Sequence, residues 1–300
     1  MELISIVYFS VYFLAFATHS ADAVGPTSYD YDTVITFTIF DWNQNKFVNH
    51  TTVETNFASY GCTTSDPFVV TVHGWMNGCY RTPWLQDTLN NFVIHRKGCV
   101  LCMDYSPITD SSDFFTVVAQ IDGIASTLVK KMRQLIAFGM NPLKGMLYGF
   151  SLGTQVAFHA GRDLAPVKLG RIDACDPPGI GFDSNATHNS LSVMDAAVEV
   201  QCIHTSSNIG TLQRVCHKDW LMGYCGWLQF GFKSSHELCP DYYNAAFSYN
   251  FPATINPYLC PTTRAALLWP PGFKMGYFMP QGIPLIGNFF AKTSVLFPYN

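Results

Sequence analysis

The sequence predicts an α/β domain with a mostly parallel central sheet and helices on both faces of that sheet. Short apolar and β-branched segments, which suit buried strands, alternate along the 300 residues with longer segments whose apolar residues recur at helical spacing. A strand candidate at 146–148 also leads through a tight turn into a helix candidate at 154–164. Strands that alternate with helices favour a parallel sheet, whose functional side chains collect at the carboxyl ends of the strands.

The elements expected before that turn begin with an alternating, β-branched strand at 33–40. Residues 69–72 are more uniformly apolar and predict a buried strand, and residues 85–95 follow with one apolar helical face. A third strand is expected at 100–104. The next segment, 113–140, keeps apolar residues at helical spacing throughout and predicts one long amphipathic helix. After the turn, strands are expected at 169–173 and 197–203 and a helix at 242–247.

The N-terminus has the features of a secretory signal peptide. Residues 3–16 form an apolar run that is too short to span a bilayer, and Ala21-Asp22-Ala23 offers a cleavage site. We therefore expect residues 1–23 to be removed and the mature chain to be secreted. The alternative is a buried first strand, because the segment carries Glu2 and neither Lys nor Arg.

Cysteine usage agrees with export. All ten cysteines follow residue 23, and an even number indicates disulfides formed in an oxidising compartment, although their pairing stays open. Asn49 and Asn185 begin sequons and are candidate glycosylation sites in a secreted protein. Cys99 and Cys102 lack a second pair at matching spacing, so no metal site is expected.

Charge and hydropathy exclude two classes of partner. The formal net charge of −4 offers no electrostatic basis for binding nucleic acid. No run after the N-terminal segment is long and uncharged enough for a transmembrane span. The hydrophobic fraction of 48% indicates ample material for a core.

The turn after residue 148 carries the motif Gly149-x-Ser151-x-Gly153. In this motif a serine stands on a sharp strand-to-helix turn, and glycines on both sides leave room for the helix. Three fixed positions also occur by chance, but the strand before and the helix after favour a catalytic serine. Such a serine needs a histidine to accept its proton and a carboxylate to orient that histidine.

Chain order narrows the candidates for these partners. In α/β-hydrolases the serine is followed by the acid and then by the histidine. Asp173 and Asp176 both follow the next strand; we favour Asp176 because it lies in a turn past the strand end, and interpret Asp173 as solvated or capping. The later histidines are His188, His204, His217 and His236. His236 is favoured, because a nearby disulfide at Cys239 would give a base the fixed platform that it needs.

Acyl transfer also requires backbone N–H groups that stabilise the developing oxyanion. One donor is expected to be Leu152, directly after the nucleophile. The other is expected to be Trp75, in the His73-Gly74-Trp75 turn that follows the strand at 69–72.

These segments together resemble the pancreatic lipase family of secreted neutral lipases. The similar segments are Gly149–Gly153, His73–Trp75, Asp176–Gly179, Ile203–Thr205 and Ser235–His236, in the order and roughly the spacing of that family. The resemblance implies an α/β-hydrolase fold, Ser151, Asp176 and His236 as the catalytic triad, and no cofactor. Residues 24–300 are expected to form one catalytic domain without the C-terminal β-sandwich, as in the short venom-type phospholipases A1.

Two further departures from the family pattern bear on the substrate. The lid loop of the family lies between two cysteines, and here Cys216 to Cys225 encloses only eight residues. The apolar residues Trp220, Leu221 and Trp227 in and after it suggest a lip that touches a lipid surface. Ordinary packing is the alternative. The acidic calcium ligands of the family find a counterpart only in Asp195, so no metal is expected.

The sequence therefore predicts a secreted serine ester hydrolase that acts on lipids, of the phospholipase A1 or triacylglycerol lipase type, at a lipid–water interface. A non-catalytic lipid-binding or yolk-type storage protein on the same fold is the main alternative, because a fold does not guarantee activity. A secreted protease is a weaker alternative. The sequence indicates no particular protein partner.

Overall fold

The computed structural model describes residues 30–184, 192–223, 234–258, 260, 274–283 and 285–299. The predicted signal peptide at 1–23 lies outside these ranges. Within them, no helix combines the length and the apolar character that crossing a bilayer requires.

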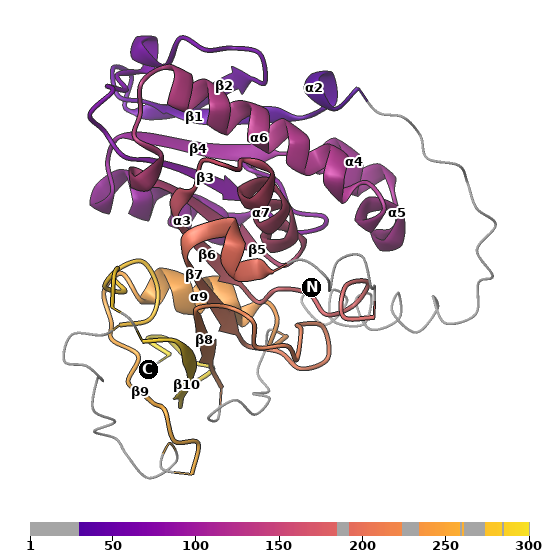
Figure 1. Cartoon of the computed structure of the whole chain (residues 1–300), viewed down its shortest axis with the longest axis vertical. Coiled ribbons are helices and arrows are strands. Elements are labelled where there is room, and N and C mark those ends of the chain that lie inside the picture. The colour runs from indigo at the N-terminus through magenta and orange to yellow at the C-terminus, as the bar shows by residue number, and fades with distance from the viewer. Residues whose placement is uncertain are drawn as a thin grey trace.

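Ten strands of the described ranges form one sheet, which runs from the top to the bottom of Figure 1. They are β1 (Thr36–Asp41), β2 (Lys46–Thr51), β3 (Phe68–Val72), β4 (Cys99–Asp104), β5 (Gly145–Phe150), β6 (Leu169–Cys175), β7 (Ala197–His204), β8 (Lys218–Leu221), β9 (Ala253–Thr254) and β10 (Gly287–Ala291). Their order is β2-β1-β4-β3-β5-β6-β7-β8-β10-β9. The pairs from β4 to β10 are parallel, and the pairs that involve β1 or β9 are antiparallel.

The helices of the described ranges are α2 (Tyr31–Val34), α3 (Pro83–His95), α4 (Ser106–Ser111), α5 (Phe114–Val118), α6 (Ile121–Ala137), α7 (Leu152–Asp163) and α9 (Leu238–Ala245). Short 3₁₀ turns lie at η2 (Phe57–Tyr60), η3 (Pro142–Lys144) and η4 (Val193–Ala196).

Alternating strand residues divide the core into two layers. In β3, Val70 and Val72 belong to the cluster that contains the apolar faces of α6 and α7, whereas Val69 belongs to the cluster of α3 and α9. In β5, Leu147 faces the first cluster and Met146 faces the second. Since successive side chains of a strand point to opposite faces, helices cover both faces of the sheet. The predicted fold class is confirmed.

Most predicted elements lie where they were expected, and three differ. The helix expected at 242–247 is α9, which begins four residues earlier, at Leu238, and ends at Ala245. The segment 113–140 is divided into α5 and α6, because Gln120 turns out of helical geometry and its N–H bonds the carbonyl of Val117. The start of the predicted strand at 33–40 is the end of α2, so β1 begins only at Thr36.

Four disulfides are described: Cys62–Cys99, Cys79–Cys102, Cys175–Cys239 and Cys202–Cys216. The expected anchor at Cys239 is present, and it joins the end of β6 to the start of α9. The expected enclosure of a lid loop by Cys216 and Cys225 is wrong, because Cys216 pairs with Cys202.

Candidate active site

Ser151 occupies a sharp turn between β5 and α7. Its backbone has φ 51° and ψ −125°, a conformation that non-glycine residues rarely adopt. The neighbouring glycines are required by space: a Cβ on Gly153 would lie 2.3 Å from the Val72 carbonyl oxygen, and one on Gly149 would lie 2.6 Å from the Gly153 carbonyl oxygen. The Ser151 N–H donates to the carbonyl of Cys175, which fastens the turn to the end of β6.

Three side chains that are remote in sequence meet at this turn. His236 Nε2 lies 2.8 Å from Ser151 Oγ, and His236 Nδ1 lies 2.5 Å from Asp176 Oδ2. All three side chains are largely buried. Nδ1–H donates to the carboxylate because the carboxylate can only accept, and Nε2 is then free to accept the serine proton. This is the geometry that a serine nucleophile with a general base requires.

Asp176 follows β6 directly and is fully buried. Its Oδ1 accepts from the backbone N–H groups of Thr205 (2.7 Å) and Ser206 (3.1 Å), and its Oδ2 accepts from the Ser206 hydroxyl (2.5 Å) as well as from His236. Burial by itself raises the pKa of Asp176, but the hydrogen bond and charge of His236, with the bonds from Ser206 and Thr205, hold that pKa below its ordinary value. The carboxylate is therefore ionised.

The rival candidates have other partners. Asp173 is buried and bonded to Arg171 and Tyr243, so its interpretation as a solvated or capping residue is wrong. His204 bonds Asp219 through Nε2 at 2.7 Å. His217 accepts from the Val200 N–H. His188 lies outside the described residues.

The expected oxyanion donors flank the nucleophile. Gly74 lies against it, since a Cβ at Gly74 would be 3.2 Å from Ser151 Cβ. The carbonyl of Gly74 is bonded to His73 Nδ1 at 2.8 Å, which fixes the peptide that joins Gly74 to Trp75. In the described part of the chain, neither the Trp75 N–H nor the Leu152 N–H has a hydrogen-bond partner. Both groups therefore remain available to a ligand.

A cavity of about 560 Å³ opens over Ser151 and His236. The larger part of its wall is apolar, with the aromatic residues Trp75, Trp84, Phe114 and Phe150. Charged side chains also line it, namely Arg81, Asp87, Glu237 and Asp241. Met76 lines the same cavity and is 56% exposed, so apolar surface extends from the serine to the outside of the molecule. Such walls suit an acyl chain.

The apolar lip expected at Trp220 and Leu221 is not formed by these residues. Both lie in β8 and are buried, and the Trp220 ring packs 5.0 Å from that of Phe289 in β10. Their apolar character therefore reflects a position in the sheet and not in a loop. Trp227 lies outside the described residues.

One of the two candidate glycosylation sites, Asn49, lies in the described residues. Asn49 is exposed in β2, and its side-chain oxygen accepts from the Tyr80 hydroxyl at 2.9 Å. Asn185 lies outside the described residues. Glycosylation at both stays a prediction.

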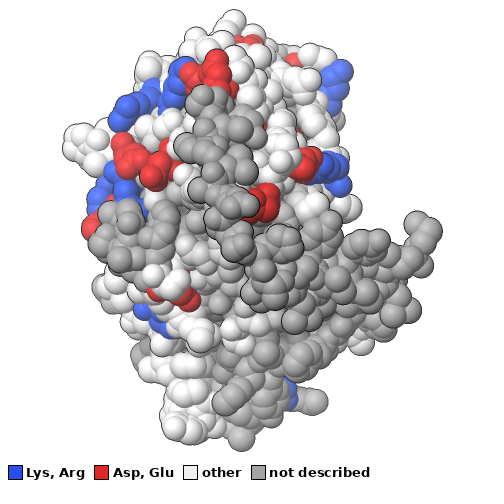
Figure 2. Space-filling view, turned by 90° about the vertical axis from the view of Figure 1, so that its right-hand side faces the viewer, with Lys and Arg blue, Asp and Glu red and all other residues white. Residues whose placement is uncertain are grey.

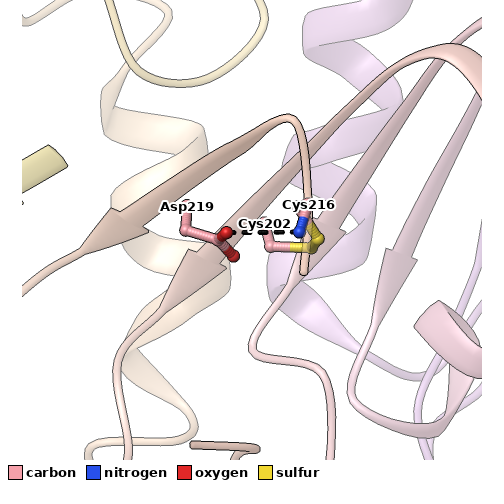
Figure 3. Close-up of side chains that lie close together, drawn as sticks. All are labelled: Cys202, Cys216 and Asp219. Atoms are coloured by element: carbon pink, nitrogen blue, oxygen red, sulfur yellow. Dashed lines mark hydrogen bonds between the residues drawn. A yellow bond between two sulfur atoms is a disulfide. The ribbon is translucent and has the colours of Figure 1, made fainter. Parts of the chain in front are cut away.

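The described residues contain one group that has the residue types of a metal site: Cys202, Cys216 and Asp219 (Figure 3). The two sulfur atoms are joined in a disulfide and are not thiolates, so they are not available as ligands. Asp219 accepts from the Cys216 N–H at 3.2 Å, which gives this carboxylate a structural partner. The cluster is therefore a disulfide with a hydrogen-bonded carboxylate beside it.

The surface carries little charge. On the face shown in Figure 2, blue and red side chains are interspersed over the described residues and do not gather into a basic patch. This distribution agrees with the net charge of −4 and gives no support for a nucleic-acid surface.

Comparison with known proteins identifies related chains. A "Phospholipase A1" of Polybia paulista is 38% identical over 81 residues, so the alignment spans 26% of this chain and only about a quarter (25%) of that relative's length. A "Phospholipase A1" of Vespa crabro is 28% identical over 218 residues, which are 67% of this chain and 68% of that protein. The "Hepatic triacylglycerol lipase" of Mus musculus is 25% identical over 171 residues, 53% of this chain and 33% of that protein.

The broadest similarity is to a whole family. The sequence model described as "Lipase" matches residues 18–223, which is more than half of the chain and includes Ser151 and Asp176. The motifs at these positions, the parallel sheet and the relatives agree with that match. The protein belongs to the lipase family, in its pancreatic lipase branch.

Proposed function

We propose that the protein is a secreted serine hydrolase that cleaves carboxylic esters of lipids. The observation that carries the proposal is the continuous chain of contacts from Ser151 through His236 to Asp176 at the floor of an apolar cavity. The four described disulfides support export.

The proposed reaction has two stages. Ser151 Oγ attacks the acyl carbonyl while His236 Nε2 accepts the serine proton, and the carbonyl oxygen becomes an oxyanion near the N–H groups of Trp75 and Leu152. His236 then donates its proton to the leaving alcohol, and an acyl group remains on the serine. Water, activated by the same histidine, attacks the acyl group and releases the fatty acid. Asp176 stabilises the imidazolium in both stages and stays ionised.

Phospholipid is the favoured substrate class, with cleavage of the A1 type. The support is the name of the Vespa crabro relative, which aligns over about two thirds of both chains, while the relative named as a triacylglycerol lipase aligns over a third of its own length. Triacylglycerol is the alternative substrate.

The test compares the purified protein with its Ser151→Ala form on phospholipid vesicles, triacylglycerol emulsion and a short p-nitrophenyl ester. We expect turnover by the native protein on at least the phospholipid, and a loss of about 10⁴-fold or more in the variant. A fluorophosphonate probe should label the native protein at Ser151. Equal, near-zero turnover by both forms, without labelling, would refute catalysis and favour the storage-type alternative.

A further inference from the structure

The buried carboxylate of Asp176 has an additional side-chain partner that the mechanism above does not use. His236 and the hydroxyl of Ser206 both lie 2.5 Å from the same atom, Asp176 Oδ2. The two backbone N–H bonds go to the other oxygen, Oδ1. Ser206 is therefore the one described side chain that shares the histidine's oxygen on the acid.

The direction of the Ser206 hydroxyl is fixed by its surroundings. Its oxygen accepts from the Gly210 N–H at 2.8 Å, and its proton must point to Asp176 because an ionised carboxylate has no proton to give. Gly210 fits closely over the pair: a Cβ there would lie 2.8 Å from Asp176 Oδ1 and 2.9 Å from Ser206 Oγ. Hydrogen bonds from the Thr211 N–H to Pro177 and from the Gly179 N–H to Ile209 fasten the same turn to the segment after Asp176.

This arrangement limits both the motion and the charge of the acid. Donors on both oxygens prevent rotation of the carboxylate about its Cβ–Cγ bond, so Oδ2 stays directed at His236 Nδ1. A second donor on Oδ2 also withdraws part of the electron density that His236 would otherwise receive. The strength of the His236–Asp176 contact thus depends on Ser206, although Ser206 touches neither the histidine's reacting nitrogen nor the nucleophile.

We propose that Ser206 is a positioning residue of the active site, whose hydroxyl orients Asp176 and moderates the hydrogen bond between Asp176 and His236. The proposal rests on the proposed ester hydrolysis for its kinetic consequences, but its structural consequence is independent of any substrate.

The test uses Ser206→Ala in the full-length protein. We expect kcat on the preferred ester to fall about tenfold with KM within about twofold, because a carboxylate that is free to rotate no longer holds His236 in line with Ser151. The acid limb of the pH–rate profile should move to higher pH, because a carboxylate with fewer donors presents more negative charge to the imidazole of the general base and so favours its charged form. A role confined to stability would lower the melting temperature and leave that limb in place.

A second readout does not require activity. The proton between His236 Nδ1 and Asp176 Oδ2 gives a low-field NMR resonance, and Ser206→Ala should move it further downfield as the contact strengthens. The matched control is Thr205→Val, which removes a buried neighbouring hydroxyl that has no hydrogen-bond partner among the described residues. It should move the resonance and the acid limb much less.

The outcomes separate the two proposals. If the native protein hydrolyses no ester, the proposed function fails, and the resonance still decides the role of Ser206. If the native protein is active and Ser206→Ala changes neither the acid limb nor the resonance, this inference is overturned alone. Should Ser206→Ala fail to fold, the native protein supplies the test: a nuclear Overhauser effect between the Ser206 hydroxyl proton and the low-field proton supports the inference, and its absence contradicts it.

Discussion

Three of the six described non-glycine residues with positive φ lie at the candidate site. Ser151, Asp176 and Met76 all have positive φ, with values of 51°, 46° and 58°, and all three border or form the candidate site. Such conformations persist only where the surroundings hold them. Here the Ser151 N–H bonds the carbonyl of Cys175 and the Asp176 N–H bonds that of Ile203, so strand ends hold both residues. The strained conformations of Ser151 and Asp176 are thus held by the carboxyl ends of β6 and β7.

His73 illustrates a residue that acts through the backbone. Its Nδ1–H donates to the Gly74 carbonyl, and its Nε2 accepts from the Tyr105 N–H at 3.2 Å. Because a trans peptide is planar, fixing the Gly74 oxygen also fixes the Trp75 N–H, which points the opposite way. We predict that His73→Phe, which keeps a ring to stack on Tyr105, lowers kcat about tenfold or more with little change in KM.

Steady-state kinetics on a soluble ester check this prediction. His73→Asn serves as the partial rescue, because its side-chain amide can donate from near the position of Nδ1. Equal kcat in the native and His73→Phe proteins would show that the Gly74–Trp75 peptide needs no such support.

At the scale of elements, the spacing of apolar residues predicts where helices occur better than it predicts where one helix ends and the next begins. The apolar stripe continues from Val118 through Ile121 and Ile124, so nothing in its spacing marks the boundary at Gln120. The boundary depends on a tertiary contact, since the Gln120 side chain bonds the Thr116 carbonyl and the Tyr31 hydroxyl. The four-residue strand β8 was missed because it is short and its apolar residues resemble those of a loop lip.

The disulfide Cys175–Cys239 joins the two elements that carry the acid and the histidine. Cys175 directly precedes Asp176, and Cys239 lies three residues after His236. We predict that replacing both cysteines by alanine lowers the free energy of unfolding by about 4 kcal/mol, from loss of the cross-link across 64 residues. The same change should lower kcat even where the variant is fully folded, because the acid and histidine are no longer tied.

The control is the double replacement of Cys62 and Cys99 by alanine. The disulfide between these two cysteines closes a loop of 37 residues remote from the site. It should cost a similar free energy, about 4 kcal/mol, and spare kcat. Denaturant titration gives the first quantity and turnover below the unfolding transition gives the second. If the two double variants reduce kcat to the same extent, the Cys175–Cys239 disulfide does not position the acid and the histidine.

At the scale of the whole molecule, the sequence predicts the residues of the candidate triad better than the residues that position them. Ser151, Asp176 and His236 follow from a motif, from chain order and from family resemblance, and the fold brings them into contact. The bonds of Ser206 to Asp176 have no such local pattern. They arise because β6 and β7 are neighbours, which places the turns after both strands side by side.

The exposed apolar surface beside the cavity is where we expect the protein to contact a lipid surface. Met76 lies at the cavity with half of its side chain exposed, and its left-handed backbone accepts asparagine readily. We predict that Met76→Asn reduces hydrolysis of phospholipid vesicles several-fold, because less apolar area enters the lipid surface, while hydrolysis of a soluble short ester changes little. Parallel assays on the two substrates check this. An equal fall on both would assign Met76 to the acyl pocket and not to surface contact.

The stability of the whole molecule should depend on a buried lysine, Lys131, whose pKa is lowered by burial to about 7 and which is therefore charged in the acid range. The Lys131 ammonium, on α6, lies 3.0 Å from His50 Nε2 and 2.9 Å from the carbonyls of Thr51 and Glu54, so it ties the edge strand β2 to the core. Burial and the charge of Lys131 lower the pKa of His50 to about 4 against its usual 6.5, and the Glu54 carboxylate offsets this only in part.

Because the folded pKa lies below the unfolded value, the unfolded chain binds a proton between pH 6.5 and pH 4 that the folded protein does not. Stability should therefore fall as the pH is lowered through this window. His50→Gln leaves an acceptor for Lys131 and removes the titrating group, so proton uptake on unfolding should drop by about one proton. Denaturant titrations of both proteins across the window measure the slopes. Identical slopes would mean that carboxylates elsewhere, and not His50, set the acid limit of the fold.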